Sequence, residues 1–332
     1  MINQDSYFPA EWEAQSGVLL TWPDMFTDWA DIIDEVCPVY EHIVSEILAR
    51  EKLLVVCRDK NILPSFVANK AIIREMSIND TWARDHGPIT VIENGNPVLL
   101  NFCFNGWGMK FLASDDNLIS PNLFQSKAFN PSVKFSDLSS FVFEGGSIES
   151  NGKGCLMTTS QCLLSKYRNP QMGKEEVERY LLDKLHSQRM IWLDNGFLKG
   201  DDTDSHIDTL ARFCSEDTVA YVKCDDEKDV HYDSLRKMED ELIPTGFKLV
   251  PLPFPDAVFD DGSRLPATYA NFLIMNEAVL FPVFGVDQDA EALNIAKKLF
   301  PTRQIVAIDS VPLIKQHGSV HCITMQFPSG VL

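Results

Sequence analysis

The chain has 332 residues, of which 45% are apolar and 10% aromatic, so it can bury a sizeable core and is not expected to be disordered. Its net charge of −19 disfavours nucleic acid and anionic membrane surfaces as partners. The same charge weakly favours a small cationic ligand, although acidity that only keeps the protein in solution explains it equally well.

The sequence contains no uncharged apolar run of 18 residues, and residues 1–5 lack the features of a signal peptide. We therefore expect a cytoplasmic protein that does not bind membranes. The eight cysteines form no CxxC pair, which argues against a zinc site and against a disulfide framework. For most of them the simplest interpretation is a small buried apolar side chain. The sequence leaves homo-oligomer formation open.

Short β-branched runs alternate with helical patterns along the chain. Strands are predicted at residues 53–56, 190–193, 219–222 and 305–308. Helices are predicted at residues 29–50, 174–188 and 287–300. Pro38 should kink or break the first helix, and Asp287 is the expected N-cap of the last. The alternation is typical of an α/β fold, and no Gly/Ser/Pro-rich linker divides it.

Five polar clusters recur at nearly even spacing. Their markers are Asp85, Glu144, His206, Tyr269 and Cys322, which follow one another at steps of 59, 62, 63 and 53 residues. A fixed period with one strand-rich unit per cluster is typical of radially repeated folds, whose loops meet at one centre. The clusters share no sequence, so the spacing alone leaves coincidence as an alternative.

Cys322 is the cysteine whose neighbours suggest a nucleophile. The alternation after Gly318 predicts a strand that ends the chain, with Cys322 beside a glycine-bearing loop. A nucleophilic cysteine reacts as the thiolate and needs a nearby base or cation. The adjacent His321 would point to the opposite face of that strand, which makes it a poor partner.

The segment 200–208 offers a better partner. His206 and Asp208 are two residues apart, so on a strand both side chains would face the same side, as an acid/base pair requires. The four aspartates and the histidine of this segment could equally hold a metal ion or form a solvated acidic loop. Asp85 and Glu144, each taken alone, fit ordinary turn or cap positions.

Nine short motifs follow one another over nearly the whole chain. They are residues 8–13, 19–23, 79–88, 104–108, 144–149, 168–170, 200–213, 266–272 and 318–326. In this order they resemble the agmatine deiminase branch of the guanidino-modifying enzymes, the group that includes bacterial peptidylarginine deiminase. The resemblance implies a five-bladed α/β propeller, the pentein fold. It also implies that residues 1–332 form one catalytic domain of five ββαβ-like units.

The resemblance implies catalytic roles for five residues. Cys322 matches the nucleophile of the family, and His206 matches its general acid and base. Asp85 and Asp208 match the two carboxylates that grip the guanidinium, and Glu144 matches the acid that holds the histidine. Neither a metal nor an organic cofactor is implied.

Four further positions carry weaker implications. Trp82 and Trp107 match aromatic walls for the stem of the substrate. His317 stands where many relatives have glycine, and His86 stands where small or aromatic residues are commoner. Neither departure removes a catalytic group, and the sequence leaves the roles of both histidines open.

The implied reaction is hydrolysis of agmatine to N-carbamoylputrescine and ammonia, in polyamine biosynthesis, through a covalent intermediate on Cys322. Deimination of peptidyl or free arginine, or amidino transfer to an amine, would use much the same residues. A non-catalytic binding protein is the alternative from another class, because the ribosome anti-association factor shares the propeller. The presence of Cys322, His206 and Asp208 argues against it.

Overall fold

The computed structural model describes residues 5–332, and its elements follow the predicted α/β pattern. The predicted strands correspond to β2 (Lys52–Cys57), β9 (Arg189–Leu193), β11 (Thr218–Lys223) and β17 (Gln304–Asp309). The predicted helices correspond to α1 (Ile33–Leu48), α7 (Lys174–Lys184) and α9 (Asp289–Leu299). The α/β class is therefore confirmed.

One order of strand pairing recurs in five sheets of the described chain. In each sheet the first strand is antiparallel to the second, the second is parallel to the third, and helical structure connects the second to the third. The strands of the first two sheets are β4 (Ile89–Glu93), β5 (Asn96–Cys103) and β6 (Lys134–Val142), then β7 (Glu149–Ser150), β8 (Cys155–Thr159) and β9. Those of the next two are β10 (Ala211–Ser215), β11 and β12 (Lys248–Pro253), then β15 (Leu273–Met275), β16 (Ala278–Val283) and β17.

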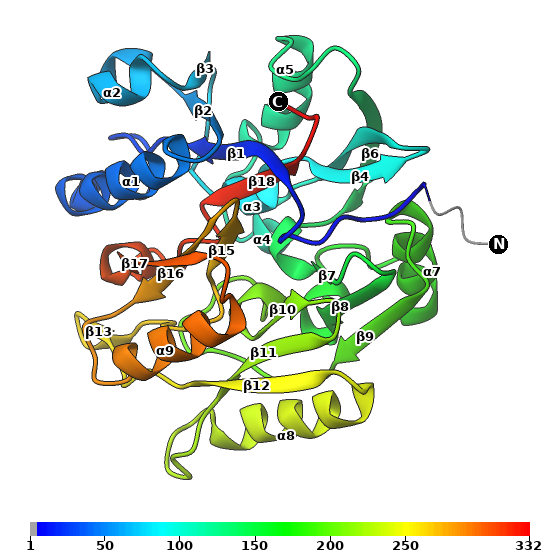
Figure 1. The fold of residues 1–332 in the computed structure, drawn as a ribbon, viewed down its shortest axis with the longest axis vertical. Helices are drawn as coiled ribbons and strands as arrows, with labels where there is room; N and C mark the ends of the chain where they lie inside the picture. Colours follow the sequence, from blue (N-terminus) through cyan, green and yellow to red (C-terminus); the bar gives the residue numbers. More distant parts are fainter. Residues whose placement is uncertain (1–4) are drawn as a thin grey trace.

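The fifth sheet joins the two ends of the chain. Strand β18 (Thr324–Pro328) is antiparallel to β1 (Gln15–Thr21), which is parallel to β2. Strand β3 (Ile72–Glu75) adds a fourth, parallel strand. Figure 1 shows the five sheets following one another around the molecule, so this joint closes the circle.

Shorter elements complete the fold. The connecting helices of two further units are α5 (Ile119–Gln125) and α8 (Tyr232–Leu242). Single-turn helices are α2 (Ser65–Ala68), α3 (Ala83–His86), α4 (Gly106–Met109), α6 (Ser160–Leu163) and α10 (Val311–Ile314). The 3₁₀ turns are η1 (Ala30–Ile32), η2 (Lys60–Ile62), η3 (Asp116–Leu118), η4 (Gly145–Ser147), η5 (Ile207–Thr209) and η6 (Ile243–Thr245). A small hairpin consists of β13 (Phe259–Asp260) and β14 (Ser263–Arg264).

Two local expectations need correction. Helix α1 is not broken at Pro38, because six of its side chains are buried and this packing outweighs one lost backbone hydrogen bond. The N-cap of α9 is Gln288 and not Asp287. The Asp289 carboxylate instead accepts hydrogen bonds from the backbone N–H groups of the loop before the helix.

Each of the five polar clusters lies just before the first strand of a unit. Asp85 precedes β4, Glu144 precedes β7, His206 precedes β10, Tyr269 precedes β15 and Cys322 precedes β18. First strands hold the same position in their sheets, so the loops before them lie at the same end of each unit. The even spacing therefore reflects a repeated unit, and the repeat brings the clusters together. Among residues 5–332, every helix is too short or too polar to cross a membrane.

Candidate active site

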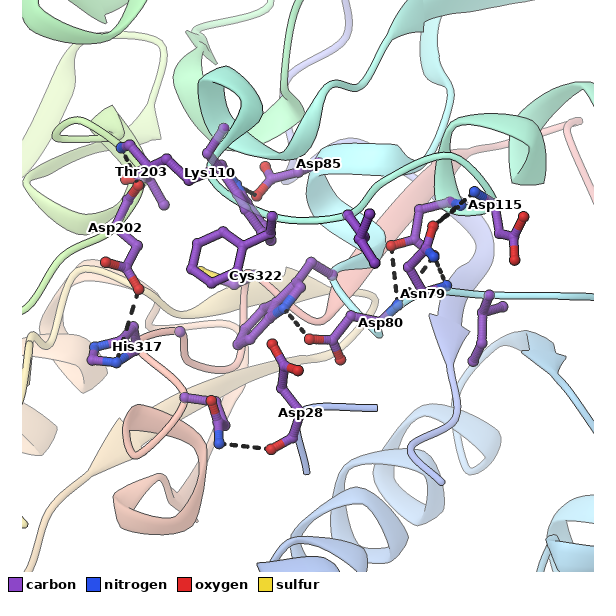
Figure 2. Close-up of a pocket in the computed structure, with 18 of the residues that line it drawn as sticks. Asp28, Asn79, Asp80, Asp85, Lys110, Asp115, Asp202, Thr203, His317 and Cys322 are labelled. Atoms are coloured by element: carbon purple, nitrogen blue, oxygen red, sulfur yellow. Dashed lines mark hydrogen bonds and ion pairs between the residues drawn. The ribbon is translucent and has the colours of Figure 1, made fainter. Parts of the chain in front are cut away.

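A cavity of about 630 Å³ opens at the end where these loops meet. Cys322 and Asp85 lie in its wall (Figure 2). Trp82 and Trp107 line the cavity as well. The other lining residues are Phe26, Asp28, Arg58, Ile78, Asn79, Asp80, Lys110, Phe111, Leu112, Asp115, Asp116, Asp202, Thr203, Gln316, His317 and Gly318. His206, Asp208 and Glu144 lie outside this lining and are almost fully buried.

Cys322 lies in a turn and not on a strand, because β18 begins only at Thr324. Its side chain is 5% exposed, and the thiol is 3.3 Å from Asn271 Oδ1. Burial and the nearby carboxylates of Asp208 and Asp85 raise the pKa of the thiol well above its ordinary value. Without a cation beside it, the sulfur is therefore held as the neutral thiol.

Asn271 is a site residue that our sequence reasoning missed. Its Oδ1 also accepts hydrogen bonds from the backbone N–H groups of His321 and Cys322. This single amide oxygen therefore fixes the turn that presents the sulfur. The fourth marker, Tyr269, is not part of the site, since its hydroxyl donates to Asp289. Asn271 lies within the motif 266–272, and this motif was the sequence feature that could have identified it as a site residue.

Gly146 marks the point at which three predicted side chains converge. A Cβ atom on this residue would lie 2.5 Å from His206 Nδ1, 2.9 Å from Asp85 Oδ1 and 3.1 Å from Asp208 Oδ2. Only glycine leaves room for this arrangement. His206 and Asp208 do not lie on a strand as expected: His206 is the N-cap of η5, and Asp208 is inside that turn. The tertiary fold, and not strand alternation, brings the two side chains together.

His206 is 1% exposed, and neither of its ring nitrogens has a hydrogen-bond partner among the described residues. Nδ1 lies 3.7 Å from Asp85 Oδ1, and Nε2 lies 3.9 Å from Glu144 Oε2. Burial disfavours the imidazolium, but Asp85 first, then the Cys162 sulfur and Glu144, outweigh it and hold the pKa of His206 well above its usual value. The ring is thus a buried proton donor with unoccupied hydrogen-bonding capacity.

Glu144 is held by a residue that sequence reasoning did not single out. Arg168 Nε donates to both Glu144 oxygens at 3.1 and 2.9 Å, and both side chains are fully buried. Burial raises the pKa of a carboxyl, but Arg168 and His206 outweigh it and keep the pKa of Glu144 below its ordinary value. Arg168 also donates to Asp204. The motif 168–170 was the sequence feature that could have identified Arg168 as a site residue.

Asp85 is anchored through both carboxylate oxygens. Oδ1 accepts from the backbone N–H of Gly146 at 3.0 Å, and Oδ2 accepts from Trp107 Nε1 at 2.8 Å. Burial, together with Asp208 and Glu144, raises the pKa of Asp85 despite the opposing influence of His206. Trp107 therefore holds a carboxylate as well as forming a wall.

Trp82 packs directly against the turn that carries Cys322. A Cβ atom on Gly318 would lie 2.0 Å from Trp82 Cζ3, so only glycine allows this approach. Trp82 Nε1 donates to Asp80 Oδ2 at 3.0 Å, which fixes the ring. Trp82 and Trp107 meet edge to face with ring centroids 6.1 Å apart. Both tryptophans thus form walls of the cavity.

Two aspartates of the segment 200–208 are engaged by contacts within the segment or with neighbouring elements. Asp201 accepts from Thr203 and from the backbone N–H of Ser205. Asp204 forms ion pairs with Lys110 and Arg168. These contacts favour a turn that orders His206 over a separate binding loop.

The two unusual histidines differ in their surroundings. His317 lies in the cavity wall with a φ of 67°, contacts the Gly200 carbonyl through Nδ1 and has Nε2 3.8 Å from Asp202. His86 is buried behind the site, where burial lowers its pKa to about 3. His317 can therefore contact a ligand, whereas His86 is a neutral packing residue.

Alkylation of Cys322 by iodoacetamide should be slow near pH 7 in the free enzyme and accelerate as the pH rises. Because the pKa of the thiol is raised, the thiolate fraction is small at neutral pH and grows about tenfold per pH unit below that pKa. The rate is measured by mass spectrometry of the Cys322 peptide. Asp208→Asn, which removes one repelling carboxylate, should react faster at a given neutral pH. A rate independent of pH in the wild type would contradict this expectation.

The fold, together with a buried cysteine, histidine and set of carboxylates, is that expected of a hydrolase acting on guanidino groups. The sequence profile of the Porphyromonas-type peptidyl-arginine deiminase family matches residues 7–328, and the chain belongs to that family. The enzyme class expected from the sequence, a hydrolase of guanidino C–N bonds, is thereby confirmed at the level of the family.

Individual relatives resemble the chain over its whole length. A Legionella pneumophila protein named as a candidate agmatine deiminase is 31% identical over 97% of this chain and 94% of its own. The structure of a candidate arginine deiminase from Porphyromonas gingivalis is 44% identical with a TM-score of 0.94, covering 98% and 99% of the two chains. A C. jejuni agmatine deiminase, a Cys→Ser variant with substrate bound, is 35% identical with a TM-score of 0.94, covering 98% and 97%.

Proposed function

We propose that this protein is an agmatine deiminase that hydrolyses agmatine to N-carbamoylputrescine and ammonia. The observation that carries the proposal is the charge of the cavity beyond Cys322. Six aspartates line it: Asp28, Asp80, Asp85, Asp115, Asp116 and Asp202. Burial foremost, and neighbouring carboxylates in addition, raise the pKa of Asp80 to about 8 and of Asp116 to about 7. A substrate with a cation at each end would relieve this crowding.

The arginine and the lysine in the wall are already engaged, and the ring of His317 contacts the Gly200 carbonyl and faces Asp202. Arg58 donates to Asp24 and to the Ile78 carbonyl, and Lys110 donates to Asp204 and to the Asp202 carbonyl. Free arginine would bring its carboxylate into this acidic wall without a cation to receive it. The ammonium of agmatine meets no such penalty.

We propose that Asp85 and Asp208 grip the guanidinium and that Cys322 attacks its central carbon. Charge-assisted hydrogen bonds of this kind contribute about 1.5–3 kcal/mol each. The bound cation offsets the carboxylates that hold Cys322 as a thiol, so the thiolate forms beside the substrate. Sulfur attack gives a tetrahedral intermediate, and His206, oriented by Glu144, protonates the departing nitrogen, which leaves as ammonia.

The resulting thiouronium adduct on Cys322 is then hydrolysed. Neutral His206 takes a proton from water, the water oxygen attacks the same carbon, and the C–S bond breaks to give the ureido product and the thiolate. Trp82 and Trp107 flank the substrate stem. A Cys→Ser variant of the C. jejuni agmatine deiminase was solved with substrate bound, which supports a cysteine in this role.

We propose in addition that residues 1–332 form one catalytic domain, since all five units supply a loop to the cavity end. Residues 1–4 lie outside the described part of the chain. A cytoplasmic location is proposed because the cysteines are free thiols. In that setting the product would feed putrescine formation.

Deimination of peptidylarginine is the second candidate. The cavity exceeds the needs of a four-methylene diamine chain, and its rim carries the exposed apolar side chains of Phe26, Phe111 and Leu112. An arginine inside a peptide has its carboxylate in an amide bond and therefore lacks the free carboxylate that the acidic wall rejects. These features leave room for a larger substrate.

An ammonia-release assay across agmatine, free arginine and a C-terminally blocked arginine peptide separates these candidates. We expect kcat/KM for agmatine to exceed that for arginine by about 100-fold or more, because an unpaired carboxylate in an acidic wall costs several kcal/mol. Higher activity on the blocked peptide would favour the second candidate. Turnover of arginine but not agmatine would refute the proposal.

A further inference from the structure

His321 and the N-terminal motif 8–13 have no part in the chemistry described above, yet they meet behind the site. His321 Nδ1 lies 2.7 Å from Asp208 Oδ2, and His321 Nε2 lies 2.8 Å from Glu11 Oε2. The histidine is 1% exposed. A segment near the start of the chain is thus linked through one imidazole ring to a carboxylate of the site.

The two oxygens of Asp208 have different surroundings. Oδ2 is held by His321, whereas Oδ1 is buried and has no hydrogen-bond partner among the described residues. A carboxylate oxygen left unpaired in the protein interior is costly unless a ligand donates to it. Fixing Oδ2 also fixes the rotation of the carboxylate, and with it the direction in which Oδ1 accepts.

We propose that His321 is a positioning residue for guanidinium binding, which holds Asp208 Oδ2 so that Oδ1 receives the substrate, while Glu11 and Arg212 secure the far side of the imidazole. The proposal rests on the role of Asp208 given under the proposed function. It assigns a purpose to Glu11, and through it to the N-terminal motif.

The hydrogen on Nδ1 follows from the contacts. An ionised Asp208 can only accept, so Nδ1 must donate. Nε2 can donate to Glu11 or accept from Arg212 Nη2, which lies 3.1 Å away, and either bond fixes the ring. Arg212 is itself fully buried and bonded to Glu11 and Glu149. The ring therefore has little freedom to turn.

The charges of this cluster favour an ionised Asp208. Burial opposes ionisation, but His321 outweighs it and keeps the pKa of Asp208 below its ordinary value. In the same way Arg212 and His321 outweigh burial and keep the pKa of Glu11 below its ordinary value. Asp208 is thus prepared as an acceptor before the substrate arrives.

The main chain of His321 is held independently of its ring. Its N–H donates to Asn271, and its carbonyl accepts from Arg84. Side-chain substitutions at this position can therefore be interpreted without a shift of the neighbouring Cys322. Asparagine carries an amide N–H at the position of Nδ1, whereas glutamine carries one at the position of Nε2. The pair His321→Asn and His321→Gln separates the bond to Asp208 from the bond to Glu11.

The test measures how n-butylguanidine protects Cys322 from iodoacetamide in the wild type and in both variants. The bound guanidinium carbon would lie against the sulfur and exclude the reagent, which outweighs the thiolate that its charge favours. This probe carries the guanidinium without the distal ammonium, so it reports the grip of Asp208 whatever the true substrate is. We expect His321→Gln to raise the half-protecting concentration by about tenfold or more, as for loss of one well-oriented charge-assisted bond. His321→Asn should stay within about threefold of the wild type.

Equal protection in both variants, or weaker protection in His321→Asn than in His321→Gln, would overturn the proposal. A loss of protection that follows the fall in melting temperature in both variants would show a merely structural role for His321. That result would overturn the proposal as well. If His321→Gln does not fold, a tenfold loss in a stable His321→Asn overturns the proposal and retained protection supports it. Failure of the wild type to release ammonia from agmatine would refute the proposed function alone, because the butylguanidine comparison does not depend on it.

Discussion

Replacing Cys322 by serine should reduce ammonia release from agmatine by at least about 10⁴-fold, because the hydroxyl is a far weaker nucleophile than the thiolate. Substrate binding should persist, since Asp85 and Asp208 remain. Steady-state ammonia assays give the loss in kcat, and calorimetry with agmatine gives the affinity. Mass spectrometry of the quenched wild-type enzyme should show the thiouronium adduct on the Cys322 peptide.

Cys37→Ser provides the matched control. Cys37 is partly exposed on helix α1 and does not line the cavity. It should keep wild-type turnover, which separates loss of the nucleophile from general effects of cysteine replacement. Wild-type ammonia release by Cys322→Ser would exclude the covalent mechanism.

Replacing His206 by asparagine should lower kcat by about 10²–10⁴-fold, the usual contribution of a positioned acid and base. The loss should appear in kcat more than in KM, since proton transfer is needed during the reaction and the carboxylates that bind the guanidinium remain. Steady-state kinetics on agmatine give kcat and KM, and a melting curve shows whether the variant is folded as stably as the wild type.

His86→Gln is the control for a buried histidine. The ring of His86 contacts Thr21 at 3.3 Å through Nε2, and glutamine can supply an amide in place of that nitrogen. The His86→Gln substitution should lower the free energy of unfolding by about 1 kcal/mol or less and leave kcat nearly unchanged. If His206→Asn and His86→Gln reduce kcat equally, His206 is not the acid and base.

Local geometry was the weakest part of the prediction from sequence. Strand alternation was applied to Cys322 and to His206 with Asp208, but both segments are turns held by side-chain contacts. The alternation argument also set His321 aside, although its ring contacts Asp208. Such turns depend on partners far along the chain, such as Asn271 for Cys322, and a local pattern does not contain them.

Arg168 is a second case in which the local sequence did not reveal the partner of a site residue. Its motif was recognised, but nothing in the residues near it indicates a partner 24 positions earlier. Because both side chains are fully buried, the ion pair is stable only when the fold supplies all of its hydrogen bonds at once. A buried partner of this kind is defined by packing.

The sequence by itself determined the α/β class, the five-unit spacing and the set of chemically competent residues, because hydrophobic periodicity and residue type are local properties. Only the tertiary structure decided which atoms converge. It brought Asp85, His206 and Asp208 around Gly146, where the absence of a side chain leaves them room. Cys322 lies more than 100 residues in sequence from Asp85, His206 and Asp208, and their approach results from the closure of five packed units by β1 and β18.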